Sequence, residues 1–199
     1  MEINLIILAV ICYFIGSIPF AYILTKLFGF GDVRNIGSGN VGATNVLRTG
    51  KKKLAFLVLF FDILKGFLPL IVLNNYLFTN SSELIVCSIA SLTILGHILP
   101  LWLRFKGGKG VATYVGYIFA INYIFGLFFI FSWLFIASIK KYSSLASIVS
   151  LIMLPLLLYV MQFNKDINLL ILFISIIILI KHYPNILRLF NKTESKIKF

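Results

Sequence analysis

The sequence predicts an all-α integral membrane protein with seven transmembrane helices, its N-terminus outside the cell and its C-terminus in the cytoplasm. Of the 199 residues, 60% are hydrophobic and 12% are charged, and the mean hydropathy is +1.03. A soluble domain carries about a quarter of its residues as charged types, so this chain has too little polar surface to be covered by water. We therefore expect residues 1–199 to form a single membrane-embedded domain.

Apolar runs of about 20 residues are long enough to cross the hydrocarbon core once as helices. Five runs of this kind are expected to form spans: Ile3–Leu24, Leu54–Leu73, Leu84–Leu103, Leu145–Met161 and Ile167–Ile180. The run from Val111 to Ile139 is too long for one plain span, and Asn122 and Tyr123 mark a break inside it. We expect two short helices here, which brings the total to seven. A re-entrant pair that never reaches the far side is the alternative.

Basic residues give the orientation of these spans. The chain has 18 Lys and Arg residues against 6 Asp and Glu, a net charge of +12. Nearly all of the basic residues follow the first and third spans, precede Leu145 or lie at the C-terminus, whereas the segment from Asn74 to Glu83 has none. The positive-inside rule places these groups in the cytoplasm. It also accounts for the basic excess without a nucleic-acid partner, and leaves some charge available for anionic lipids or an anionic substrate.

Three cytoplasmic segments contain most of the polar sequence, and the first runs from Asn35 to Gly50. Four of its residues are glycines, which let the backbone turn its N–H groups toward an anion, while hydroxyl and amide side chains add neutral hydrogen bonds. Its candidate functional residues are Ser38, Asn40, Thr44, Asn45 and Arg48. The alternative is an ordinary polar loop between two spans.

The second segment begins at Gly96 and ends where an apolar helix starts. Glycines that lead directly into a helix place its free N–H groups and positive dipole end toward an anion. The candidate residues are His97, Lys106, Gly107, Gly108, Lys109, Gly110 and Thr113. The spacing of a Walker loop is absent, so a nucleotide is not indicated. The alternatives are a charged stop after the third span and, for the histidine alone, a role in packing.

The third segment runs from Lys181 to Phe190. His182, Asn185 and Arg188 are three residues apart, so a helix would bring them to one face. Taken alone, the segment also fits an amphipathic tail that lies on anionic headgroups. Inside the second span, Asp62 and Lys65 share the same spacing, and charges at membrane depth are expected to pair. That pair is either structural or in contact with a substrate.

Together and in this order, the three segments resemble the motifs of the bacterial acyl-phosphate:glycerol-3-phosphate acyltransferases, the PlsY family, over essentially the whole chain. Gly37 through Arg48 is similar to the first motif and Gly96 through Gly110 to the second. His182-x-x-Asn185 with Thr193-Glu194 is similar to the third, although Pro184 and Lys192 depart from the family pattern. The resemblance also implies a fold of seven spans.

The resemblance implies transfer of a fatty acyl group from acyl phosphate to the 1-position hydroxyl of glycerol 3-phosphate. The product would be lysophosphatidic acid, in the first step of phospholipid synthesis, made on the cytoplasmic side of the bacterial inner membrane. The two substrates and membrane lipids are the expected partners. No cofactor, metal, acyl-CoA, acyl carrier protein or obligate protein partner is expected.

The resemblance also assigns roles. Ser38, Arg48 and His182 would be catalytic, and the other candidates named in the three segments, except Arg188, would bind substrate. Lys109 and the glycines around it would hold phosphate, as would His182 and Asn185. Asp62, Lys65, Arg188 and Glu194 would support the site, Glu194 by holding the C-terminal tail. Ser38 has no histidine base in its own segment, so a covalent acyl-serine is not indicated. The proton of the attacking hydroxyl would go to His182 or to a substrate phosphate oxygen.

Two other classes of protein share some of these features. A small organic-anion transporter would also have polar glycine loops and a charged pair within the membrane, but transporters bind near the midplane and usually contain an internal repeat, which we do not find. A metal-dependent lipid-phosphate enzyme would need clustered acidic ligands, and the six carboxylates of this chain are scattered. The acyltransferase is therefore the function that the sequence favours.

Overall fold

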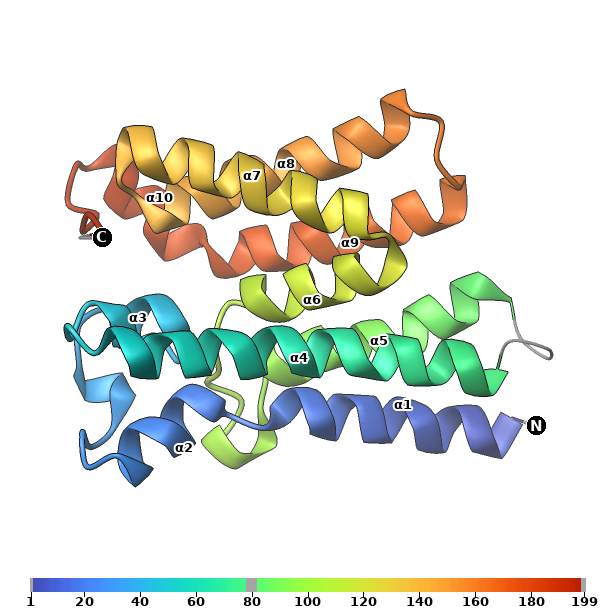
Figure 1. Ribbon diagram of the computed structural model, residues 1–199, viewed down its shortest axis with the longest axis horizontal. Coiled ribbons are helices and arrows are strands. Elements are labelled where there is room, and N and C mark those ends of the chain that lie inside the picture. The colour runs from blue at the N-terminus through green and yellow to red at the C-terminus, as the bar shows by residue number, and fades with distance from the viewer. Residues whose placement is uncertain (1, 78–81, 198–199) are drawn as a thin grey trace. The chain divides into compact units, whose positions relative to one another are not determined.

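The computed structural model describes residues 2–77 and 82–197, and in these ranges the regular structure is entirely helical (Figure 1). The chain divides into two compact units, Met1–Ile121 and Asn122–Phe199. The middle of the segment that was expected outside the cell, residues 78–81, lies outside the described residues.

The first unit is built around two closely packed helix pairs. Its elements in chain order are α1 (Glu2–Ser17), α2 (Phe20–Leu27), the short 3-10 turn η1 (Val33–Asn35), α3 (Ala43–Leu47), α4 (Lys52–Leu77), α5 (Glu83–Ile98), the 3-10 turn η2 (Leu101–Leu103) and α6 (Val111–Ile121). The most extensive contacts join α4 to α6 and α1 to α5, and α4 also packs against α5. This arrangement packs four apolar helices together, with the polar loops at their ends.

Glycines allow the two pairs to pack closely. Gly16 and Gly96 lie at the contact of α1 with α5, and Gly66 and Gly116 at the contact of α4 with α6. A Cβ atom added at any of the four would overlap a backbone carbonyl of the facing helix. Lipid-embedded helices associate through close packing of this kind, because burial of apolar surface does not drive their association in hydrocarbon.

The first apolar run forms two helices. Pro19 has no N–H and disfavours a helical conformation of the preceding residue, so α1 ends at Ser17 and α2 begins at Phe20, bent by 41°. The expected span Ile3–Leu24 therefore consists of two helices with a bend between them. The break exposes the carbonyl of Ile18, which becomes part of the polar cluster described below.

The second unit contains α7 (Tyr123–Lys140), α8 (Ser143–Val160), α9 (Lys165–Lys181) and α10 (Tyr183–Phe190). Helices α7 and α8 pack together, with hydrogen bonds from Ser132 Oγ to Ser150 Oγ (2.8 Å) and from Trp133 Nε1 to Ser147 Oγ (3.0 Å). The chain bends by 58° between α9 and α10. Pro184 falls in the first turn of α10, where a missing N–H costs no helical hydrogen bond.

The described helices account for four to six membrane spans. Four are long and apolar enough by themselves, and six result if each bent pair is counted as one span. The break predicted at Asn122 is confirmed, because α6 ends at Ile121 and Asn122 Oδ1 accepts a hydrogen bond from Ile124 N at the start of α7 (2.8 Å). At 11 residues, α6 is shorter than a usual span. Seven crossings and the orientation of the termini remain predictions.

Candidate active site

The first glycine-rich segment is organised by the buried side chain of Asn45. Its Oδ1 accepts hydrogen bonds from Ser38 N (2.8 Å) and Ser38 Oγ (3.2 Å). Its Nδ2 donates to the carbonyls of Val33 (3.0 Å) and Ile36 (2.8 Å). The amide therefore ties α3 to the turn that carries Ser38. This internal role differs from the substrate contact expected for Asn45, and that contact stays a prediction.

The turn around Ser38 needs glycines. Gly37 and Gly39 have φ angles of 57° and 70°, in the left-handed region where glycine pays no steric penalty. A Cβ atom at Gly37 would also overlap Asn45 Oδ1, and it would lie 3.9 Å from Cβ of Arg48. Ser38 is exposed and Arg48 is half-buried at the end of α3. The fold thus brings Ser38 and Arg48, ten residues apart, to the same loop.

Two other candidates lie in this segment. Asn40 and Thr44 are both partly buried, and Gly42, between them, precedes the first residue of α3. A Cβ atom at Gly42 would lie 3.2 Å from Asn40 Nδ2, so this glycine leaves room for the Asn40 amide. Their expected contacts with substrate also stay predictions.

The second segment is pinned to the C-terminal end of α5. After η2 the chain returns, and the N–H groups of Gly107 and Gly108 donate to the carbonyls of Ile98 (3.3 Å) and His97 (3.1 Å). These carbonyls belong to the last turn of α5, where no helical N–H remains to bond them. The glycine loop therefore has a fixed position beneath α5.

The expected cations of this loop differ in exposure. Lys106 is exposed, whereas Lys109 is partly buried just before Gly110, whose φ of 92° turns the chain into α6. Thr113, in the first turn of α6, is fully buried and its Oγ1 has no hydrogen-bond partner among the described residues. The loop therefore leads into the N-terminus of α6 as the sequence predicted, with Lys109 nearer to the packed interior than Lys106.

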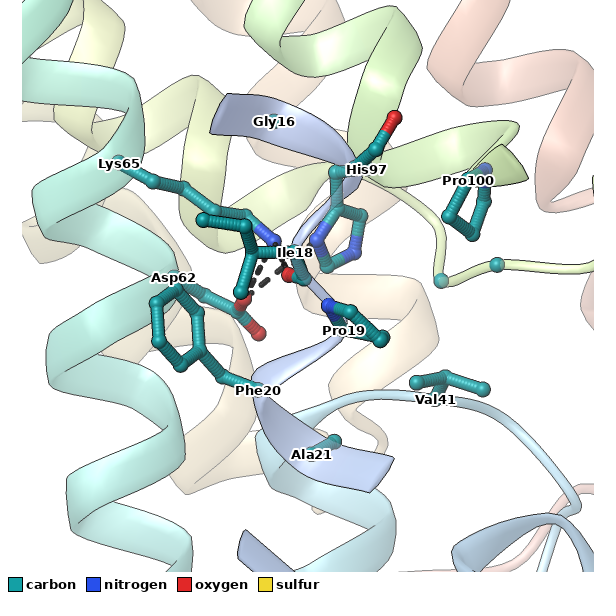
Figure 2. Close-up of a pocket in the computed structure, with 13 residues that line it drawn as sticks. Gly16, Ile18, Pro19, Phe20, Ala21, Val41, Asp62, Lys65, His97 and Pro100 are labelled. Atoms are coloured by element: carbon teal, nitrogen blue, oxygen red, sulfur yellow. Dashed lines mark hydrogen bonds and ion pairs between the residues drawn. The ribbon is translucent and has the colours of Figure 1, made fainter. Parts of the chain in front are cut away.

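A cluster of charged and polar groups lies between α1, α4 and α5 (Figure 2). Lys65 Nζ lies 2.8 Å from Asp62 Oδ1 and donates to the carbonyl of Ile18 at the break between α1 and α2 (2.8 Å). His97 Nδ1 lies 3.5 Å from Asp62 Oδ1. All three side chains are almost completely buried. The ion pair expected within the second span is therefore present, joined by the histidine of the second motif.

This cluster lines a small pocket of about 200 Å³. Ser17 is fully buried in its wall, and Ser17 Oγ has no hydrogen-bond partner among the described residues. The pocket thus has both polar and apolar walls within the helix packing.

In the second unit, the third motif forms a hydrogen-bonded cluster around Glu194. Its Oε1 accepts from Ser144 Oγ and Asn185 Nδ2, each at 2.9 Å, and its Oε2 accepts from Arg188 Nε at 2.7 Å. Burial raises the pKa of the Glu194 carboxyl, but the hydrogen bonds from Arg188, Asn185 and Ser144 outweigh this effect and the net pKa is lowered. Glu194 thereby ties the C-terminal tail to α8 and α10.

His182 lies at the bend between α9 and α10 and is buried. Its Nδ1 is 2.8 Å from the carbonyl of Ile178, one turn earlier in α9. Because a carbonyl can only accept, Nδ1 carries a proton, and in the neutral ring Nε2 is then the basic nitrogen. Asn185 shares one face of α10 with Arg188, as the spacing predicted, and its Oδ1 is buried without a partner among the described residues.

Residues that sequence reasoning missed complete these clusters. Ile18 and Val33 contribute backbone carbonyls, and Ser144 contributes a hydroxyl to Glu194 from 50 residues away. Backbone carbonyls leave no trace in the residue types. Ser144 belongs to a polar stripe of α8 with Ser147 and Ser150, a pattern that predicts one buried face of this helix but names no partner.

Comparison with known proteins identifies the family. The family model described as glycerol-3-phosphate acyltransferase matches residues 6–192. Among relatives named glycerol-3-phosphate acyltransferase, the protein of Pelagibacter ubique (strain HTCC1062) is 47% identical over 193 residues, 97% of each chain. That of Brucella anthropi is 45% identical over 197 residues, 99% of this chain and 95% of the relative. The chain belongs to the glycerol-3-phosphate acyltransferase family.

Solved structures agree with this family assignment. The crystal structure of PlsY, an integral membrane glycerol 3-phosphate acyltransferase, in its glycerol 3-phosphate form is 38% identical, with a TM-score of 0.90 over 98% of this chain and 96% of that one. The lysophosphatidic acid form is 37% identical, with a TM-score of 0.87 over 97% and 95%. The resemblance stated from the sequence is confirmed, as is a helical integral membrane fold. The transporter alternative has no support from these comparisons.

Proposed function

We propose that this chain transfers an acyl group from acyl phosphate to a hydroxyl of glycerol 3-phosphate, releasing phosphate and forming lysophosphatidic acid. Full-length similarity to glycerol-3-phosphate acyltransferases supports the acceptor and the product. The donor is our inference from the chemistry of the loops. Acyl phosphate has a good leaving group, so the enzyme mainly needs to orient two phosphate-bearing molecules and to stabilise charge.

The observation that carries the proposal is the Asn45-organised loop. It joins the turn that carries the exposed Ser38 to α3, which ends at Arg48, and a Cβ atom built at Gly37 would lie 3.9 Å from Arg48 Cβ. An arginine suits a phosphate or the developing acyl oxyanion, because its planar donors pair with two oxygens at once. We infer that Arg48 stabilises charge during transfer and that the Ser38 hydroxyl, which donates to Asn45 Oδ1 in this structure, turns this hydrogen bond to the substrate during the reaction.

The remaining candidates complete the proposal. Lys106 and Lys109 would bind phosphate together with the glycine backbone before α6. His182 Nε2 would accept the proton of the attacking hydroxyl, unless a phosphate oxygen of the substrate takes it. Direct attack by the glycerol hydroxyl needs no covalent enzyme intermediate and no cofactor.

We further propose seven crossings, with the N-terminus outside and the three motifs at the cytoplasmic face of a bacterial inner membrane. The basic residues beside the motifs support this orientation. The break at Asn122 supports two crossings within 111–139, and the chain would then act as a single membrane domain. Single cysteines in a variant without Cys12 and Cys87 would test it: a membrane-impermeant thiol reagent should label Asn74→Cys and spare Thr49→Cys in intact spheroplasts. The reverse labelling would contradict the orientation.

The activity is tested with purified protein in detergent or lipid mesophase. Glycerol 3-phosphate is supplied with palmitoyl phosphate, and separately with palmitoyl-CoA, and lysophosphatidic acid is measured. We expect product with palmitoyl phosphate as donor and none with palmitoyl-CoA. Product with palmitoyl-CoA alone would contradict the donor, and no product with either donor from folded protein would contradict the proposed activity for this chain.

Two variants test the reaction centre. Arg48→Ala and Ser38→Ala should each lower turnover by on the order of 100-fold or more, the scale seen when one stabilising donor is removed from a reaction centre. Thr49→Val is the matched control, because the Thr49 hydroxyl bonds only the Val46 carbonyl of its own turn (2.7 Å) and the variant should remain active. Retained turnover in Ser38→Ala would remove Ser38 from the proposed centre.

A further inference from the structure

Three ionisable side chains are buried together between α1, α4 and α5. Asp62, Lys65 and His97 have side chains that are between 2% and 7% exposed, within helices that the membrane surrounds. Removing charges from water costs several kcal/mol per ion, and an apolar replacement of a buried pair often costs nothing. Ionisable groups at such depth therefore call for a functional explanation.

The geometry shows what Asp62 does in this cluster. Its carboxylate lies between the Lys65 ammonium at 2.8 Å and His97 Nδ1 at 3.5 Å. Lys65 also bonds the Ile18 carbonyl between α1 and α2, so the cluster joins α4 to the break between these two helices (Figure 2). Asp62 and Lys65 cancel in charge, and a neutral His97 leaves the cluster balanced. At 3.5 Å the Asp62 carboxylate attracts an N–H at Nδ1 electrostatically and so favours this orientation of the imidazole.

The other edge of the imidazole supports the second glycine loop. A Cβ atom added to Gly108 would overlap His97 Nε2, and it would lie 2.5 Å from the carbonyl of Val41. Gly108 is thus packed between the ring of His97 and the backbone of the first polar loop. The Gly108 N–H also bonds the His97 carbonyl (3.1 Å). One residue therefore holds the second loop through both its ring and its backbone, and the second loop contacts the first.

We propose that Asp62 and His97 are positioning residues for acyl transfer, which set the register of the two glycine loops through Gly108 and Val41. This inference rests on the proposed function and deepens it. The Nε2 edge of His97 is covered by Gly108, so the ring acts through the loop backbone. The role differs from the direct substrate contact that the sequence suggested for His97. Lys65 balances the charge of Asp62 and ties the cluster to the Ile18 carbonyl.

The test uses the purified full-length enzyme and four variants: Asp62→Asn, His97→Ala, the double variant Asp62→Asn/His97→Ala, and the charge-balanced double variant Asp62→Asn/Lys65→Met. Measured for each are kcat, KM for glycerol 3-phosphate and thermal stability. Ser91→Ala is the matched control, since Ser91 lies on α5 like His97 but, among the described residues, its hydroxyl bonds the Ser88 carbonyl of its own helix (2.7 Å). Its kcat/KM should equal that of the wild type.

We expect kcat/KM to fall by about 10- to 100-fold in Asp62→Asn and in His97→Ala, the range caused by misplacing reacting groups by about 1 Å. The Asp62→Asn/His97→Ala variant should lose no more than either single variant, because the two residues act as one unit. Asp62→Asn/Lys65→Met should regain thermal stability, since no unpaired charge remains, while kcat/KM stays low.

Two results would overturn the inference. Recovery of kcat/KM together with stability in Asp62→Asn/Lys65→Met would show that the cluster only stabilises the fold. If the fold-loss of kcat/KM in Asp62→Asn/His97→Ala equals the product of the losses in the two single variants, the two residues act separately. Assays of the wild-type enzyme distinguish failure of this inference from failure of the proposed function. If the wild type is inactive with every acyl donor, only the proposed activity is refuted. In that case amide hydrogen exchange is decisive: faster exchange at residues 106–110 and 38–42 in Asp62→Asn supports the positioning role, and unchanged exchange refutes it.

Discussion

Replacing Asn45 by alanine removes four hydrogen bonds from the loop that carries Ser38. The two that Nδ2 donates to Val33 and Ile36 lie beneath the loop, where water does not readily replace them. The two accepted from Ser38 lie at an exposed residue, where water can. A typical hydrogen bond contributes about 0.5–1.5 kcal/mol net. If only the two inner bonds count, each near the upper end of this range, the closed loop loses about 2–3 kcal/mol of stability relative to the open loop.

The effect is local and can be measured at single amides. A loss of about 2–3 kcal/mol raises the population of the open loop by roughly 30- to 150-fold. The Gly39 amide, which bonds the Ile36 carbonyl within the loop (3.0 Å), should exchange faster by up to that factor, and the Ser38 amide should exchange faster because it also loses its acceptor. Activity should fall with it, because an open loop no longer holds Ser38 beside Arg48. Hydrogen–deuterium exchange with mass spectrometry over residues 36–48, together with the acyl-transfer assay, measures both effects.

Thr49→Val provides the control for this experiment, since it removes a hydroxyl next to the same loop without breaking a bond across it. Its exchange pattern and activity should match those of the wild type. If Asn45→Ala leaves both the exchange at Ser38 and the activity unchanged, the loop does not depend on the amide and the reasoning is refuted.

Two further predictions concern the rest of the fold. Because the pKa of Glu194 is lowered in the folded state, the stability that its carboxylate contributes is complete above the ordinary pKa of a glutamate and is lost as pH falls through the lowered pKa. Glu194→Gln should therefore weaken the decrease of thermal stability at acid pH. An unchanged decrease would contradict this prediction. Gly116→Ala places a Cβ atom against the Ile63 carbonyl and should lower the free energy of unfolding by about 1–3 kcal/mol or more, measured by thermal unfolding. Val72→Ala, on the exposed side of α4, should lower it far less. Equal effects of the two substitutions would refute the close packing of α4 with α6.

Several features could be predicted from the sequence because they depend on local chemistry. The length of the apolar runs indicates the spans, and an asparagine such as Asn122 inside an apolar run indicates a helix break. The three-residue spacing of Asp62 and Lys65 places both on one helix face, where the ion pair forms. Loop glycines such as Gly37 and Gly39 indicate turns that other residues resist. Each of these is decided within a few residues of the chain.

Other features depended on which elements meet. The sequence did not indicate that Asn45 would turn inward, because an asparagine in a polar loop is equally able to face a ligand. Nor did it pair Asp62 with His97, 35 residues later and on another helix. The bend between α1 and α2 shows the same limit: Pro19 predicts it, but only the packing of α4 against these helices places Lys65 at the Ile18 carbonyl.

The sequence by itself determined that this protein is a helical membrane protein with three polar motifs, and the motifs indicated its family. These follow from composition, apolar length and residue order, which are properties of the chain before it folds. The tertiary structure alone decided which polar groups satisfy one another: Asn45 with the Ser38 turn, Asp62 with His97, and Glu194 with Ser144. The physical reason is that a buried polar group must find a partner in space, and residues distant in the chain become neighbours only when the helices pack.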